Sequence, residues 1–202
     1  MLPSGKMPYE VFIPAYRDEI LSDTVMVYGN VDEVELVLNG KTIRRQTADK
    51  GPDSDYIPVP NGGNGKNLHF PPFTFYGVPK ERGVLKAVGY HQGKKVAEYT
   101  VKTPGVPERL DITYFESGKP ATKNDLLIVY VRMLDKQGVL CPVNGIPVEL
   151  SVQGGEIVGP TSYPLEAGVA SFLVRTGEIS KININATGKG FSTRKSLKVG
   201  KE

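Results

Sequence analysis

The stretch VYGNVDEVELVLNGK, residues 27–41, decides the fold class of this chain of 202 residues. Over 33–38 the residue type changes with a period of two, so the aliphatic side chains share one face of a strand and the acidic ones share the other. The aliphatic face is formed by Val34, Leu36 and Leu38, and the acidic face by Glu33 and Glu35. Asn39-Gly40 follows at once and indicates a tight hairpin, because both turn positions need positive φ angles.

Short runs with the same alternation recur along the chain, and no long run has helical periodicity. The clearest runs are 84–90, 97–102, 110–114, 147–152, 169–174 and 181–186. Residues 126–133 are apolar-leaning throughout, which predicts a central strand buried on both faces. The 23 glycines and 16 prolines have no collagen period and therefore indicate many turns. Short strands separated by frequent turns predict an all-β fold built from immunoglobulin-like β-sandwiches.

The stretch TPGVP, residues 103–107, interrupts the strand pattern with two prolines and a glycine. Such a composition is typical of a short, stiff linker, and the alternating pattern starts again after it. We therefore expect two tandem domains, one over residues 1–104 and one over residues 105–202.

Charge and hydropathy exclude several classes of partner. The net charge is +3, and the Lys and Arg residues are scattered among acidic ones, whereas nucleic-acid-binding proteins typically carry a basic cluster. No stretch approaches the roughly 20 apolar residues of a transmembrane helix, so neither nucleic acid nor membrane insertion is expected. The first six residues lack the apolar core of a signal peptide. This leaves two interpretations open, a cytoplasmic protein or a piece of a longer exported chain.

The sequence offers few candidates for chemistry. The only cysteine, Cys141, cannot form a disulfide within the chain and is expected to be a small buried hydrophobic residue. His69 and His91 lie in separate predicted loops without a second ligand at metal-binding spacing, so neither a metal nor a cofactor is expected. Retaining glycosidases use two carboxyls about 5–5.5 Å apart, and Glu33 and Glu35 are the nearest match. Their alternation favours a solvated sheet face instead, and no catalytic residue is predicted.

Residues 47–67 read as a long loop that is rich in Gly, Asn and Asp, and we expect it to be the most mobile part of the first domain. An aromatic, proline-rich segment follows it. Aromatic rings can stack on the C–H faces of sugars, so we consider four residues as contacts for a sugar or another domain: Tyr56, Phe70, Phe73 and Tyr76. The alternative is that Phe73 and Phe75 alternate into the core as a strand.

Residues 27–41, 69–75, 83–90 and 103–105 resemble the module that follows the catalytic barrel in glycoside hydrolase family 2. Residues 134–138, 168–170 and 186–188 are similar to the bacterial immunoglobulin-like domain that closes such chains, which is also found in invasin-like surface proteins. The resemblance covers most of the chain, from about Tyr9 to Val199. The family's activity, typically that of a β-galactosidase or a related exo-glycosidase, resides in a barrel with paired glutamates. This chain contains no part of that barrel.

The resemblance implies the non-catalytic C-terminal accessory region of a secreted or periplasmic glycosidase, with the catalytic barrel as its main partner and a glycan as a second candidate. The alternatives are a free carbohydrate-binding module and a structural, adhesin-like spacer. A bare apolar patch on the first domain would favour the accessory region. Glycan binding by the isolated chain would favour the binding module.

Overall fold

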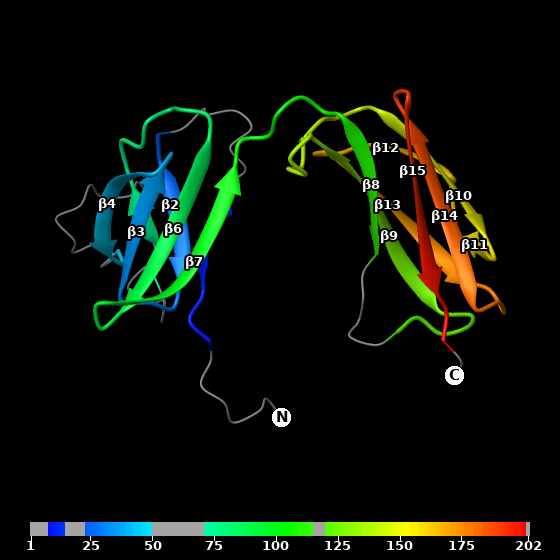
Figure 1. The fold of residues 1–202 in the computed structure, drawn as a ribbon, viewed down its shortest axis with the longest axis horizontal. Coiled ribbons are helices and arrows are strands. Elements are labelled where there is room, and N and C mark those ends of the chain that lie inside the picture. The colour runs from blue at the N-terminus through cyan, green and yellow to red at the C-terminus, as the bar shows by residue number, and fades with distance from the viewer. Residues whose placement is uncertain (1–7, 15–22, 50–70, 115–119, 201–202) are drawn as a thin grey trace. The chain divides into compact units, whose positions relative to one another are not determined.

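The computed structural model describes residues 8–14, 23–49, 71–114 and 120–200, and Figure 1 shows their arrangement. The described residues form fifteen strands and no helix, which confirms the all-β prediction. The chain divides into two compact units, Met1–Thr103 and Pro104–Glu202. Each unit is a sandwich of antiparallel sheets around its own apolar core, as expected for tandem immunoglobulin-like domains.

The first unit pairs a three-stranded sheet with a four-stranded one (Figure 1). The smaller sheet has the order β1 (Val11–Phe12), β2 (Val25–Gly29), β5 (Phe73–Phe75), and the larger has the order β4 (Lys41–Thr47), β3 (Glu33–Leu38), β6 (Val84–His91), β7 (Lys94–Lys102). The aliphatic face predicted for 33–38 lies in the core, where it meets Phe73 and Phe75 from the opposite sheet. The two phenylalanines are 0% exposed, so this strand forms as the alternation predicts.

The predicted hairpin turn is present between β3 and β4, with φ angles of 50° at Asn39 and 81° at Gly40. The Asn39 side chain also holds the start of β6, since its Oδ1 accepts the Val84 N–H at 2.9 Å and its Nδ2 donates to the Arg82 carbonyl at 3.0 Å. Gly83 lies between these two contacts with φ at 139°, and a Cβ there would come within 1.9 Å of Asn39 Oδ1. The contact between the Asn39 turn and the start of β6 therefore requires glycine at position 83, far from the turn in sequence.

The second unit consists of two four-stranded sheets (Figure 1). One has the order β11 (Gly155–Ile157), β13 (Val169–Thr176), β9 (Leu126–Leu134), β8 (Arg109–Tyr114). The other has the order β12 (Ser162–Pro164), β10 (Pro147–Gln153), β14 (Lys181–Gly188), β15 (Phe191–Lys198). Cys141 is 2% exposed within the core between the sheets, which confirms its expected role as a buried hydrophobic residue.

The prediction for residues 126–133 is right about the strand and wrong about its burial. Strand β9 buries only alternate side chains, and Leu126 and Ile128 are 51% and 43% exposed. Sequence patterning reports that both faces are apolar, but it cannot report whether a second layer covers the outer one. In this chain the inner face of β9 packs on the core and the outer face is uncovered.

A buried carboxylate at the start of the second unit was predicted only as part of a turn. Asp135 is 2% exposed, and its carboxylate accepts the backbone N–H groups of Gly105 at 2.7 Å and Val139 at 2.8 Å. The hydrogen bond from Gly105 is the main reason why the pKa of Asp135 lies below its ordinary value. Asp135 thus fastens the first residues of this unit to the β9 end of its sandwich.

Candidate functional site

Glu33 and Glu35, the nearest match to a glycosidase carboxyl pair, lie on the outer face of β3 as predicted, and both are bound by their own sheet. Glu33 Oε2 pairs with Arg45 Nη2 on β4 at 2.6 Å. Glu35 accepts hydrogen bonds from the hydroxyls of Thr42 and Tyr90, each at 2.7 Å. The guanidinium of Arg45 lies 3.7 Å from the centre of the Tyr90 ring, so the five-residue network around Tyr90 is closed on itself.

The electrostatics of this network oppose acid catalysis. Hydrogen bonds from Thr42 and then from Tyr90 hold the pKa of Glu35 below its ordinary value. The same contact with Glu35 raises the pKa of Tyr90. A glycosidase needs one carboxyl whose pKa is raised so that it carries a proton at neutral pH. The shift at Glu35 has the opposite sign and excludes it as the acid, and Glu33 is in an ion pair with Arg45. The network is therefore suited to holding the sheet rather than to cleaving a glycoside.

His91 takes part in a separate polar cluster at the end of β6. Its Nδ1 lies 3.1 Å from Asp32 Oδ1, and the Tyr9 ring stacks on the imidazole with 4.7 Å between the ring centroids. The other oxygen of Asp32 accepts the Gln92 N–H at 2.8 Å, and this bond is the main cause of a lowered pKa at Asp32. The described parts of the chain contain no group of three His, Cys, Asp or Glu residues that could hold a metal ion. His69 lies outside the described residues.

The four aromatic residues that were candidate contacts for a sugar or another domain lie in different environments. Phe73 is 0% exposed on β5, which supports the alternative that places it in the core. Tyr76 follows β5 and is half-buried. Tyr56 and Phe70 lie outside the described residues, as does most of the expected mobile loop, of which only 47–49 is described.

The described start of that loop is held against β5 by a side chain that the sequence did not single out. Asp49 accepts both the hydroxyl of Thr74, at 2.6 Å, and its backbone N–H, at 3.2 Å. The Asp49 N–H in turn donates to the Pro72 carbonyl at 2.8 Å. These contacts tie the end of β4 to the beginning of β5, so the two ends of the long connection lie close together.

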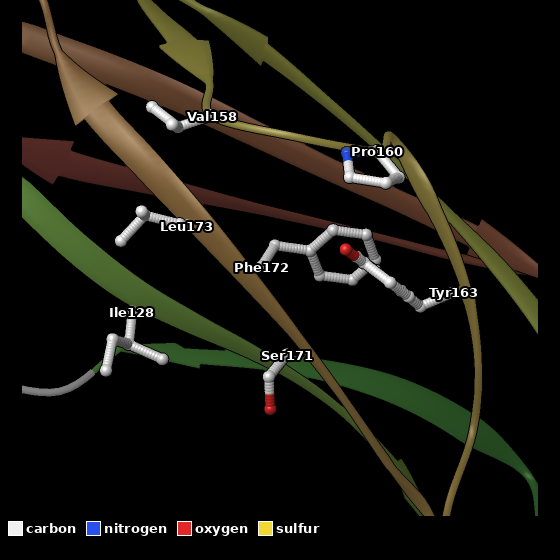
Figure 2. Close-up of a pocket in the computed structure, with 7 residues that line it drawn as sticks. All are labelled: Ile128, Val158, Pro160, Tyr163, Ser171, Phe172 and Leu173. Atoms are coloured by element: carbon white, nitrogen blue, oxygen red, sulfur yellow. The ribbon is translucent and has the colours of Figure 1, made fainter.

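A shallow hollow of about 320 Å³ lies on the second unit, along β13 between β9 and the segment that joins β11 to β12 (Figure 2). Its lining consists of Ile128, Val158, Pro160, Tyr163, Ser171, Phe172 and Leu173. Figure 2 shows the Tyr163 ring next to that of Phe172, and the two rings meet edge-on with 5.4 Å between centroids. The lining offers two hydroxyls and no carboxylate, amine or imidazole, so the hollow suits contact with an apolar or sugar face and not bond cleavage. The sequence gives no signal for this hollow, because its lining comes from four separate segments.

Comparison with known proteins extends these observations. A protein family described as "Domain of unknown function (DUF4982)" matches residues 22–97. The chain is 30% identical over 176 residues to a β-galactosidase of Thermoanaerobacter pseudethanolicus, a match that covers 81% of this chain and 22% of the relative. It is also 30% identical over 129 residues to a β-galactosidase of Rhizobium radiobacter, covering 63% of this chain and 92% of that relative.

A solved structure gives the same relationship. The crystal structure of a glycosyl hydrolase family 2 member from Bacteroides cellulosilyticus superposes with a TM-score of 0.67 at 25% identity, over 91% of this chain and 25% of that one. The chain thus spans about a fifth of the Thermoanaerobacter relative and a quarter of the solved enzyme. The chain belongs to glycoside hydrolase family 2.

Proposed function

We propose that the chain is the non-catalytic C-terminal region of a β-galactosidase-like enzyme and packs on the catalytic part of a longer polypeptide. The observation that carries the proposal is the network around Glu33 and Glu35, where both carboxylates are bound within their own sheet. The β-galactosidase of Thermoanaerobacter is more than four times as long as the part matched here, which leaves ample length for a catalytic part elsewhere. A catalytic barrel needs roughly 250 residues of its own.

We propose further that the enzyme acts on glycans outside the cytoplasm, in the periplasm or after secretion. None of the residues that the structure describes forms a helix long and apolar enough to cross a membrane. The proposal on localisation rests on the resemblance to extracellular glycosidases, and fractionation of cells that express the parent gene tests it directly.

An assay of the pure chain with an aryl β-galactoside tests the non-catalytic role. We expect no turnover, because a retaining mechanism needs two free carboxyls, and Glu33 is paired with Arg45 while Glu35 is bound by Thr42 and Tyr90. Turnover that disappears in Glu33→Gln or Glu35→Gln would refute the proposal.

Packing on the catalytic part is tested separately by deleting this region from the parent enzyme. We expect the catalytic part to lose thermal stability while its hydrolysis of a small aryl glycoside persists at low temperature. An unchanged melting temperature would show that the two parts do not pack on each other.

The hollow around Tyr163 favours a second function, weak contact with a glycan. Tyr163 is 39% exposed at its rim, and an exposed ring of this kind can stack on the apolar face of a pyranose. Tyr56, Phe70 and Tyr76 remain candidate contacts for a sugar or for the barrel. Titration with galactose and β-linked galacto-oligosaccharides, followed by NMR, should shift the signals of Ser171 and its neighbours. Tyr163→Ala should abolish the shifts and Tyr163→Phe should keep them, whereas shifts that survive Tyr163→Ala would place binding elsewhere.

A further inference from the structure

The outer face of β1 and β2 carries three large apolar side chains, which we call the β1–β2 patch: Phe12, Met26 and Tyr28. Their exposed fractions are 47%, 40% and 42%. Phe12 and Tyr28 are direct partners across the two strands, and Met26 lies on the same face two residues before Tyr28. The three side chains therefore form one continuous surface.

This surface differs from the outer face of the other sheet in the same unit. Strand β3 presents Glu33 and Glu35 outward, and β7 presents Glu98, Thr100 and Lys102 outward. Strand β2 instead places valines inward and Met26 and Tyr28 outward, so both of its faces are apolar. Large apolar side chains that are exposed and gathered on one face, with charged faces elsewhere on the same unit, are typical of an interaction surface.

The point at which the chain enters this unit identifies what covers the patch. The side chain of Asn30 fixes the segment before β1, because its Oδ1 accepts the Glu10 N–H at 2.7 Å and its Nδ2 donates to the Pro8 carbonyl at 2.9 Å. Pro8 precedes Phe12 by four residues, a span of at most about 14 Å in extended chain. In a C-terminal accessory region, the catalytic part precedes Pro8. It is therefore covalently joined to the end of the chain that lies next to the patch, which favours this occupant over a free partner.

Within the unit, the ring of Phe12 is already held in place. It meets the ring of Tyr99 edge-on, with 5.0 Å between the centroids. A side chain that is fixed and half-exposed loses little conformational freedom on binding, which is typical of residues that anchor an interface.

We propose that the β1–β2 patch is the surface through which this region packs on an apolar surface of the catalytic part of the same polypeptide. This inference rests on the proposed function, since the catalytic part is the occupant. A spacer between domains has no use for such a face, and a soluble sugar would need hydrogen-bonding groups that these three side chains largely lack.

Hydroxyl-radical footprinting of the isolated chain and of the parent enzyme tests the inference. Covering a side chain that is 40% exposed to the level of an interface core removes roughly nine tenths of its accessible surface. We therefore expect oxidation of Met26 to be about tenfold slower in the parent enzyme than in the isolated chain, with a parallel decrease at Phe12 and Tyr28. A reporter peptide added to both samples at equal concentration serves as the reference for radical dose.

The outcomes separate this inference from the proposed function. Equal oxidation of the patch in both proteins, with protection at another surface of the chain, would overturn the inference and leave packing intact. Equal oxidation everywhere, together with an unchanged melting temperature on deletion, would overturn both. Protection that grows with the concentration of the isolated chain would show that a second copy covers the patch, which also refutes the inference.

A pair of variants gives an independent readout. Met26→Ser with Tyr28→Ser should lower the melting temperature of the isolated chain only in proportion to the part of each side chain buried in its own unit, and should accelerate thermal inactivation of the parent enzyme severalfold beyond that loss. Thr100→Ala with Lys102→Ser, on the charged outer face of β7, is the matched control and should affect neither protein. Equal inactivation rates for the two double variants would contradict the inference.

Discussion

Phe73 gives the sharpest test of the structure, because the sequence left two roles open for it. At 0% exposure on β5 it packs between the two sheets of the first unit, and truncation to alanine should remove about 3–5 kcal/mol of unfolding free energy. A small domain is typically stable by only about 5–15 kcal/mol, so this one change removes a large share. The same substitution at Phe12, which is 47% exposed, is the matched control and should cost much less.

Hydrogen exchange followed by mass spectrometry measures the effect domain by domain in the full chain. Each 1.4 kcal/mol lost corresponds to about a tenfold faster exchange of amides that open only on unfolding, so Phe73→Ala should accelerate exchange in β3 and β6 by about 150-fold to 5,000-fold. Amides in β9 and β13 report the second unit and should be unaffected. If β3 and β6 exchange as slowly in Phe73→Ala as in the unmodified chain, Phe73 is not a core residue and the sugar-contact alternative regains its support.

Three further outcomes are expected. The two predicted domains, expressed separately with a cut in the 103–107 linker, should each show a cooperative melt, and failure of both halves to do so would refute the two-domain interpretation. Gly83→Ala should destabilise the first unit by about 1–3 kcal/mol in urea titration, because the residue has φ at 139° and the new Cβ would overlap Asn39; an unchanged midpoint would contradict this. Acid should weaken the second unit because the pKa of Asp135 in the fold lies below its ordinary value of 3.8. The ionised Asp135 therefore stabilises the fold at pH values above 3.8, and this stabilisation is lost as the pH falls below 3.8. The melting temperature, followed between about pH 6 and pH 3, should therefore fall less steeply for Asp135→Asn than for the unmodified chain. An equally steep fall would show that Asp135 is not the source of the acid sensitivity.

The alternation of residues was sufficient to predict most strands and the side of each that faces the core. It places Val34, Leu36 and Leu38 inward, and the structure buries all three. The Asn39-Gly40 turn was equally predictable, because its φ angles depend on two adjacent residues. The family resemblance was carried by the same local stretches, which is why the accessory-region assignment needed no coordinates.

The polar contacts were not predictable in the same way, because their partners are distant in sequence. Glu35 meets Tyr90 across 55 residues, and Asp135 meets Gly105 across 30. Residue patterning assigns each of these side chains to a face or a turn, but only the pairing of strands brings donor and acceptor together. For this reason the sequence assigned Glu33 and Glu35 only to a solvated sheet face, and the structure identified them as parts of a closed network.

The sequence determined which residues lie on the outer faces of the sheets, and only the tertiary structure decided which of these faces are covered. The sequence alone determined that this is an all-β chain, since a period of two and the turn residues are local properties, and its motifs carried the resemblance to family 2. It could not distinguish an apolar side chain that is covered from one that is bare, as the error on β9 shows with Leu126 and Ile128. Burial depends on which layer lies above a strand, and that layer is set by packing between distant segments. Only the tertiary structure could therefore reveal the β1–β2 patch and the hollow at Tyr163.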